Sequence, residues 1–218
     1  MTKSRIMKSA LSTDDVNWLI KTFNESEDRI YNETSYTSWL DIEHNDLIKN
    51  WIADKLEFFS AEQINTGFIY EMNTAYMPHC DGTKDGQLQL NIPLERSYEE
   101  KQELVIFEQT TKVGPITWID AYYPKRDEKT SGLNNLFYGP ILPYQVNNHT
   151  LQHIDIDFYR NHLMRSPEIY WGLTPETVFE QIPGDVLVFD PNAVHCTGSM
   201  PKNQNKLGMV VRIDELPQ

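Results

Sequence analysis

The sequence predicts a mainly β protein in which two helices precede the strands. Before residue 63, apolar residues recur at the spacing of amphipathic helices, and after it they alternate with polar residues as strands require. The chain has 218 residues, which is enough for one domain with a sizeable core. We therefore expect a single domain, 1–218, with a helical part at 1–62, a β core at 63–218 and an insert at about 110–167.

The helical part contains two expected helices. The first covers residues 11–24 and begins at Ser12-Thr-Asp-Asp15, which resembles a capping box. The second runs from about Asn45 to Ser60, and residues 25–41 between the helices are predicted to form a loop. The predicted buried stripe of the second helix comprises Leu47, Ile48, Trp51, Ile52, Leu56 and Phe59.

The clearest strand of the predicted β core begins after Gly86 and reaches Pro93. Leu88, Leu90 and Ile92 share one face of this strand. Gln87, Gln89 and Asn91 share the other face, which either lines a pocket or faces solvent. Further strands are expected at 68–70, 104–109, 178–182, 185–189 and 207–213.

Three side chains form a candidate metal site. His79 and Asp81 stand two residues apart, so on a strand both point to the same face, and Cys80 points to the other. His195 lies on a short strand-like run 116 positions later, after the turn signal Pro183-Gly184. Two imidazoles and one carboxylate make up the facial triad that binds non-haem Fe(II) and leaves positions open for substrates.

In this order, the motifs resemble those of the Fe(II)/2-oxoglutarate-dependent oxygenases. The resemblance spans roughly residues 64–214 and rests on His79-Cys80-Asp81, the Pro183-Gly184-Asp185 strand before His195, and the basic residues of Lys206–Arg212. It implies a double-stranded β-helix core, jelly-roll and cupin-like, with flanking N-terminal α-helices. It also implies that His79, Asp81 and His195 are catalytic and hold Fe(II), with 2-oxoglutarate and O2 as co-substrates.

The resemblance further implies a basic residue that binds the distal carboxylate of 2-oxoglutarate. Lys206 is favoured by its place near the start of the last strand, whereas Arg212 could bind a carboxylate with two parallel hydrogen bonds. The Arg-x-Ser pattern common in the family is present at neither candidate. Tyr70 either donates its hydroxyl to the same carboxylate or belongs to the core, and Asn91 could also contact the co-substrate.

A second His-x-Asp pair competes with the first. His153-Ile-Asp155 has His149 and His162 nearby, and its periodicity fits a helix or a strand. On a helix, residues two apart diverge by about 200° and cannot chelate one ion together. The order of the motifs favours His79, because the alternating Leu88 strand follows it as in the family. His149 and His153 could instead form a zinc-type pair on a helix, with no evident third ligand.

The composition limits the kinds of partner and the cellular location that we expect for this protein. With 32 acidic and 19 basic residues the net charge is −13, which disfavours nucleic acid and anionic membranes. We expect no transmembrane span and no signal peptide, and hence a cytoplasmic protein. Two cysteines are too few for a disulfide scaffold, so Cys80 and Cys196 are predicted to pack as small apolar residues.

The predicted function is that of a dioxygenase that hydroxylates a small molecule or a peptide side chain. Hydroxylation is favoured because halogenating family members have a small residue where Asp81 stands. Two alternatives stay open: a cupin-like metal enzyme of another class, such as an isomerase or hydrolase, and a non-catalytic jelly-roll binding module. The aromatic content of the insert at 110–167 favours a lid or a substrate wall.

Overall fold

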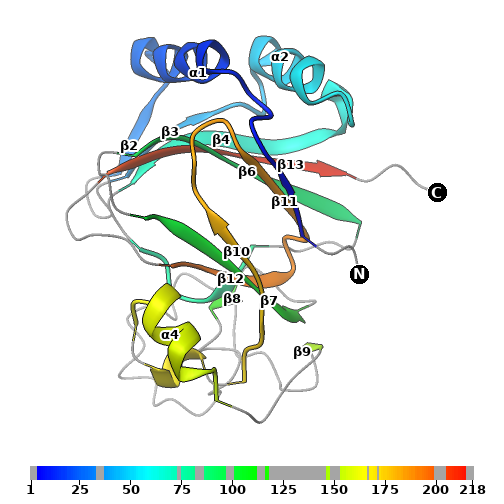
Figure 1. Ribbon diagram of the computed structural model, residues 1–218. Coiled ribbons are helices and arrows are strands. Elements are labelled where there is room, and N and C mark those ends of the chain that lie inside the picture. The colour runs from blue at the N-terminus through cyan, green and yellow to red at the C-terminus, as the bar shows by residue number, and fades with distance from the viewer. Residues whose placement is uncertain are drawn as a thin grey trace.

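Two β-sheets lie face to face in the computed structural model of this chain (Figure 1). Helices α1 and α2 cover the outer face of one sheet, and α4 lies beneath the other (Figure 1). The structure describes residues 4–32, 37–72, 75–81, 86–96, 101–111, 116–117, 146–147, 153–165, 167–170, 172–198 and 205–214.

The larger sheet has seven strands, all paired antiparallel, and the helices pack against it. In spatial order its strands are β1 (Arg5–Met7), β11 (Val186–Phe189), β6 (Gln87–Arg96), β13 (Lys206–Asp214), β4 (Ile64–Met72), β3 (Thr37–Asp41) and β2 (Ile30–Asn32). Strands β6 and β13 therefore lie near the middle of this sheet, where side chains are most completely covered.

The smaller sheet has six strands and faces the first. Its order is β10 (Pro175–Glu180), β7 (Glu103–Thr111), β12 (Ala193–Thr197), β5 (His79–Cys80) and β8 (Ile116–Thr117), with β9 (Val146–Asn147) paired to β7. From β4 to β7 and from β10 to β13, successive strands alternate between the two sheets. This alternation defines the double-stranded β-helix, so the predicted jelly-roll core is confirmed.

Helix α1 (Thr13–Glu25) begins where the sequence indicates. The Ser12 hydroxyl accepts from the Asp15 backbone N–H, and the Asp15 carboxylate accepts from the Ser12 N–H, so the predicted capping box is present. Asp15 also pairs with Lys55 of α2 at 2.7 Å. That ion pair joins the two helices at the surface.

Helix α2 (Asp46–Leu56) ends earlier than predicted, before a 3-10 turn, η1 (Ala61–Gln63). It stops because Glu57 adopts a left-handed conformation with a φ of 58°. The prediction that Leu47 is buried is wrong, since 69% of it is exposed. Ile48 and Ile52, four residues apart, face the sheet, and Leu47 is rotated about 100° away from Ile48.

The predicted loop at 25–41 is also wrong in part, because it contains β2 and β3. Strand β3 pairs with β4, with Trp39 opposite Tyr70 and Leu40 opposite Ile69. Its alternation is too short to recognise in isolation, and a neighbouring strand supplies the hydrogen bonds that stabilise it.

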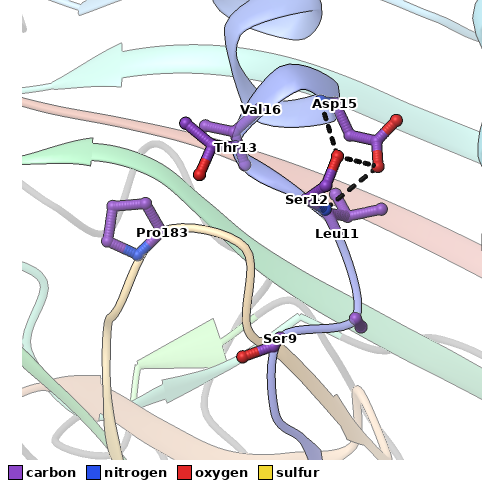
Figure 2. Close-up of a pocket in the computed structure, with 8 residues that line it drawn as sticks. Ser9, Leu11, Ser12, Thr13, Asp15, Val16 and Pro183 are labelled. Carbon is purple, nitrogen blue, oxygen red and sulfur yellow. Dashed lines mark hydrogen bonds between the residues drawn. The ribbon is translucent and has the colours of Figure 1, made fainter.

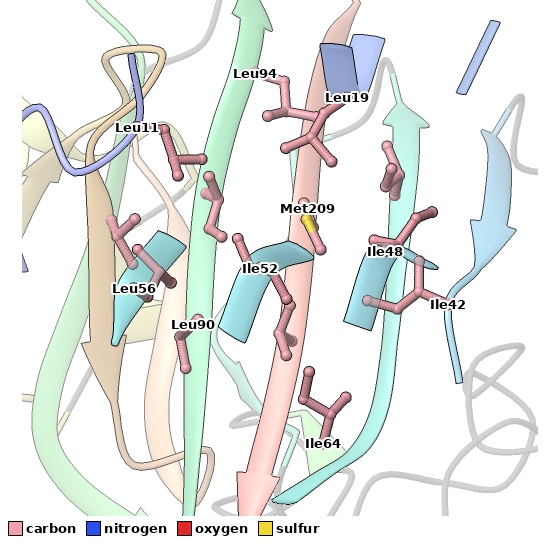
Figure 3. Close-up of a cluster of buried hydrophobic side chains, with 14 of the residues drawn as sticks. Leu11, Leu19, Ile42, Ile48, Ile52, Leu56, Ile64, Leu90, Leu94 and Met209 are labelled. Carbon is pink, nitrogen blue, oxygen red and sulfur yellow. The ribbon is translucent and has the colours of Figure 1, made fainter. Parts of the chain in front are cut away.

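The main core lies between the helices and the larger sheet (Figure 3). Ile52 from α2, Leu19 from α1 and Met209 from β13 meet in it, and none of the three is exposed to solvent. Alternation along β6 sends Leu90 into this core and Gln89 the opposite way, toward the space between the sheets. The polar row of β6 is therefore buried and does not face solvent.

The predicted insert at 110–167 is described only in pieces. Besides β8 and β9 these include α4 (Ile156–His162), with a 3-10 turn, η4 (Pro167–Tyr170), just beyond it. Residues 112–115, 118–145 and 148–152 lie outside the described residues, so the lid or substrate wall stays a prediction. Among the helices described, none has the length and hydropathy that a membrane crossing requires.

Replacing Ile52 with alanine tests the helix–sheet core. We expect Ile52→Ala to lower the free energy of unfolding by about 2–5 kcal/mol, because a fully buried side chain is removed and leaves a cavity. Leu47→Ala on the same helix is the matched control and should stay within about 0.5 kcal/mol of the parent. Equal losses in urea denaturation would contradict this packing.

Candidate metal centre

Strand pairing brings the distant histidines together. In the smaller sheet β5 lies next to β12, and His79 is directly opposite His195. Asp81 follows β5, and its backbone N–H donates to the carbonyl of Pro191 at 3.0 Å, just before β12. The three predicted ligands thus come from two adjacent segments that the jelly-roll topology places side by side.

The donor atoms of His79, Asp81 and His195 all lie within 4.8 Å of one another. His79 Nε2 is 3.5 Å from Asp81 Oδ1, and His195 Nε2 is 3.4 Å from Asp81 Oδ2. His195 is buried, whereas His79 and Asp81 keep side-chain exposures of 22% and 25%. Two nitrogens and one oxygen on a partly open cluster are the donor set of the facial triad.

Backbone carbonyls fix both imidazole rings. His79 Nδ1 lies 2.7 Å from the carbonyl oxygen of Met77, and His195 Nδ1 lies 2.9 Å from that of Ala193. A carbonyl oxygen only accepts, so each Nδ1 carries a proton and Nε2 is the ring nitrogen that faces the cluster. This is the outer contact that metal-bound histidines usually make.

The electrostatics give His79 and Asp81 the protonation states that a metal requires. Burial and the neighbouring His195 lower the pKa of His79 to about 4, so this imidazole is neutral at pH 7. Burial alone would raise the pKa of Asp81, but His195, His79 and Arg212 together hold it well below its ordinary range. A neutral imidazole and an ionised carboxylate are the forms that bind metal.

Arg212 is directed at Asp81. Its Nη2 lies 3.4 Å from Asp81 Oδ2, and its Nε donates to Gln89 Oε1 at 2.7 Å. Gln89 Nε2 in turn donates to Asp81 Oδ2 at 2.9 Å. Sequence reasoning missed Gln89, although its place on the polar face of the alternating strand was the available signal.

Lys206 is the first residue of β13, six positions before Arg212, and lies in the space between the sheets. It is 5% exposed, burial lowers its pKa to about 8, and its Nζ is 5.8 Å from the centre of the Tyr70 ring. Tyr70 is buried, which raises its pKa to about 12, and it hydrogen-bonds with Asn91. A Cβ on Gly208 would lie 2.9 Å from the Tyr70 hydroxyl oxygen, so the glycine makes room for this tyrosine.

The competing His-x-Asp pair does not join the cluster. Asp155 is the N-cap of α4 and accepts from the backbone N–H groups of Asp157 and Phe158. His162 Nδ1 contacts the buried carboxylate of Glu103 at 2.8 Å, and His153 is exposed. His149 lies outside the described residues, so the zinc-type pair is left as a prediction.

Both cysteines are buried on the outer face of the smaller sheet, in a cluster with Val105 and Tyr170. Burial raises the pKa of the Cys196 thiol, which keeps it protonated. Cys80 and Cys196 therefore point away from the triad and into packing, as predicted from strand alternation.

A separate hollow lies at the N-terminus of α1 (Figure 2). It is lined by residues 9–13, by Asp15 and Val16, and by Pro183. Figure 2 shows Ser12 and Asp15 occupied with each other through the capping box. None of the predicted site residues lines this hollow, so we assign it no role.

Comparisons with known proteins give the class of fold. No family model matches the sequence, and no curated protein matches it. HygX from Streptomyces hygroscopicus, solved with nickel and 2-oxoglutarate bound, is 11% identical with a TM-score of 0.52, over 98% of this chain and 83% of that one. EctD from S. alaskensis is 11% identical with a TM-score of 0.50, over 98% and 73% of the two chains.

A third similar structure is the non-haem α-ketoglutarate-dependent carbocyclase SnoK from nogalamycin biosynthesis. It is 13% identical with a TM-score of 0.50, over 97% of this chain and 79% of that one. The chain thus has the fold of 2-oxoglutarate-dependent enzymes, and the resemblance predicted from the sequence is confirmed in fold. At these identities the likeness concerns the fold alone.

Lys206 offers a test of the site through stability. Its pKa of about 8 lies below the 10.5 of a free lysine, so the unfolded chain holds the proton more tightly. Lys206 therefore destabilises the folded state below pH 8, and this penalty fades as the pH rises from 8 to 10.5. We expect Lys206→Met to raise the free energy of unfolding at pH 7 by roughly 1–3 kcal/mol.

Urea denaturation at pH 7 and pH 10 measures this effect. The advantage of the Met variant should shrink at the higher pH, and Lys21→Met on the surface of α1 should change stability by less than about 0.5 kcal/mol. A loss of stability in Lys206→Met at pH 7 would show that the ammonium group has a favourable partner.

Proposed function

We propose that this protein is an Fe(II)- and 2-oxoglutarate-dependent dioxygenase that hydroxylates a small molecule or a peptide side chain. The observation that carries the proposal is the meeting of His79, Asp81 and His195, with all donor atoms within 4.8 Å. These are the residues that the sequence singles out as ligands. The jelly-roll fold and its similarity to 2-oxoglutarate-dependent enzymes support the same reaction class.

The donor set suits a ferrous ion. His79 and His195 would supply Nε2 and Asp81 a carboxylate oxygen, and three ligands on one face leave the other face for co-substrates. Bound there, iron supplies the O2 chemistry that side chains lack. The protein holds both imidazoles in the required tautomer through the carbonyls of Met77 and Ala193.

Lys206 is the better candidate for the distal carboxylate of 2-oxoglutarate. It is a buried cation with no carboxylate partner among the described residues, and an anion beside it would offset the desolvation of its charge. Tyr70 lies within reach of Lys206 and carries a hydroxyl that can donate to the same anion. Arg212 is already engaged with Asp81 and Gln89, which argues against it as the carboxylate-binding residue.

The prime substrate would approach from the exposed side of the triad. Tyr76 is 46% exposed there, and its ring centre is 5.5 Å from that of His79. Its backbone is held in place, since Tyr76 N–H donates to Thr197 Oγ1 and the Tyr76 carbonyl accepts from Thr197 N–H. An aromatic face suits a small molecule or a peptide side chain, and the net charge of −13 disfavours nucleic acid.

Removing a ligand tests the proposal directly. His79→Ala and Asp81→Ala should each abolish 2-oxoglutarate turnover, because neither incomplete triad can hold iron and orient the co-substrate, while the thermal unfolding profile persists. Succinate release with Fe(II), ascorbate and candidate substrates is the measurement. Asp155→Ala removes the aspartate of the competing motif and should keep turnover, with about 1 kcal/mol of stability lost from the cap of α4.

Undiminished succinate release by His79→Ala or Asp81→Ala would refute the metal centre. Two alternatives remain: a cupin-like enzyme of another class and a non-catalytic binding module. Both predict that the unmodified protein forms no succinate in an O2-dependent reaction, whichever substrate is offered. A screen of substrates against 2-oxoglutarate consumption therefore separates these functions.

A second variant tests the co-substrate site. Lys206→Met should raise the KM for 2-oxoglutarate by about 10- to 100-fold, the loss expected for a charge-assisted hydrogen bond. Lys101→Met is the control, because Lys101 is exposed and pairs with Glu103. An unchanged KM in Lys206→Met would exclude Lys206 from the co-substrate site.

A further inference from the structure

The carboxylate of Asp81 is held by a side chain that neither the sequence motif nor the fold predicts. Gln89 Nε2 donates to Asp81 Oδ2 at 2.9 Å, and Arg212 Nε donates to Gln89 Oε1 at 2.7 Å. Arg212 Nη2 closes the triangle at 3.4 Å from the same Asp81 oxygen. We propose that Gln89, anchored by Arg212, is a positioning residue that orients Asp81 for the metal; this inference rests on the proposed function.

The chemistry of the three groups leaves one arrangement of the Gln89 amide. A guanidinium group only donates hydrogen bonds, and an ionised carboxylate only accepts them. The amide oxygen must therefore face Arg212, and the amide NH2 must face Asp81. A primary amide is suited to this place because it links a donor-only group to an acceptor-only group.

The anchoring strands are rigid. Gln89 on β6 lies directly opposite Arg212 on β13 in the register of the larger sheet, and also opposite Phe189 on β11. Gln89 is 2% exposed, so water does not compete for its hydrogen bonds. Asp81, by contrast, follows a two-residue strand in the smaller sheet. Side chains of the larger sheet thus hold Asp81 across the space between the sheets. The two-residue strand before Asp81 supports this carboxylate only weakly.

The network decides which oxygen of Asp81 is held. Gln89 and Arg212 both contact Oδ2, while Oδ1 lies 3.5 Å from His79 Nε2 with no hydrogen bond from Gln89. The carboxylate is therefore kept in one rotamer beside the imidazoles before any ion arrives. Ligands that are oriented in advance bind a metal more tightly, because less conformational freedom is lost on binding.

Cobalt binding tests this role without relying on turnover. Titration of the apoprotein with Co(II), followed by visible absorption, should show about 10- to 100-fold weaker binding for Gln89→Leu, which removes both hydrogen bonds with little change in volume. Gln87→Leu is the matched control. Gln87 is a buried glutamine on the same face of β6 that donates to Asp214, and its loss should change the affinity less than about twofold.

A double-mutant cycle separates positioning from a general effect on the sheet. In an Asp81→Ala background, Gln89→Leu should change the remaining Co(II) affinity by less than about twofold, because the group on which it acts is gone. An equal loss in both backgrounds would overturn the proposal. Gln89→Asn, which keeps an amide but shortens its reach, provides a second variant if the leucine variant does not fold, and it should also weaken binding.

The outcomes distinguish this inference from the proposed function. If Asp81→Ala alone leaves Co(II) affinity unchanged, the metal centre is wrong and both proposals fall. If Asp81→Ala weakens binding and neither Gln89 variant does, only the positioning role falls. Losses in both Gln89 variants that disappear in the Asp81→Ala background would support it.

Discussion

The pairing of β5 with β12 is the constraint on which the rest of the site depends. It sets His79 opposite His195, although 116 positions separate them along the chain. Neither strand is long, and both are held because the jelly roll alternates strands between two sheets and places these distant segments of the chain side by side within the smaller sheet. The candidate metal centre is therefore a consequence of topology, since no local segment contains all three of its candidate ligands.

The two faces of the larger sheet have different roles: one packs against the helices and stabilises the fold, and the other carries the polar groups of the candidate site. Its helix side is apolar, with Leu90 and Met209 fully buried against α1 and α2. Its inner side carries Gln89, Lys206 and Arg212, polar groups that an ordinary β-sandwich core would exclude. Burying such groups is unfavourable unless they are paired, and the Asp81 network provides that pairing for two of the three.

Much of this arrangement follows from local sequence patterns. The period-2 rule places His79 and Asp81 on one face, and the alternation of β6 separates its leucines from its amides. What the sequence could not supply was the partner of each side chain. The contact of Arg212 with Gln89 depends on the register between β6 and β13, which no local pattern encodes. For the same reason the sequence did not predict β2 and β3, because the pairing of β3 with β4 and of β2 with β3 stabilises them more than their own composition does.

If Lys206 binds the co-substrate as proposed, its buried charge would tie the lifetime of the protein to the supply of that co-substrate. An anion that neutralises this ammonium group binds only the folded chain, so by mass action it raises the free energy of unfolding as its concentration increases. A cell rich in such an anion would hold more of the protein folded, and one depleted of it would lose molecules to proteases through the unfolded state. The abundance of this protein would then follow metabolic supply without any dedicated regulator.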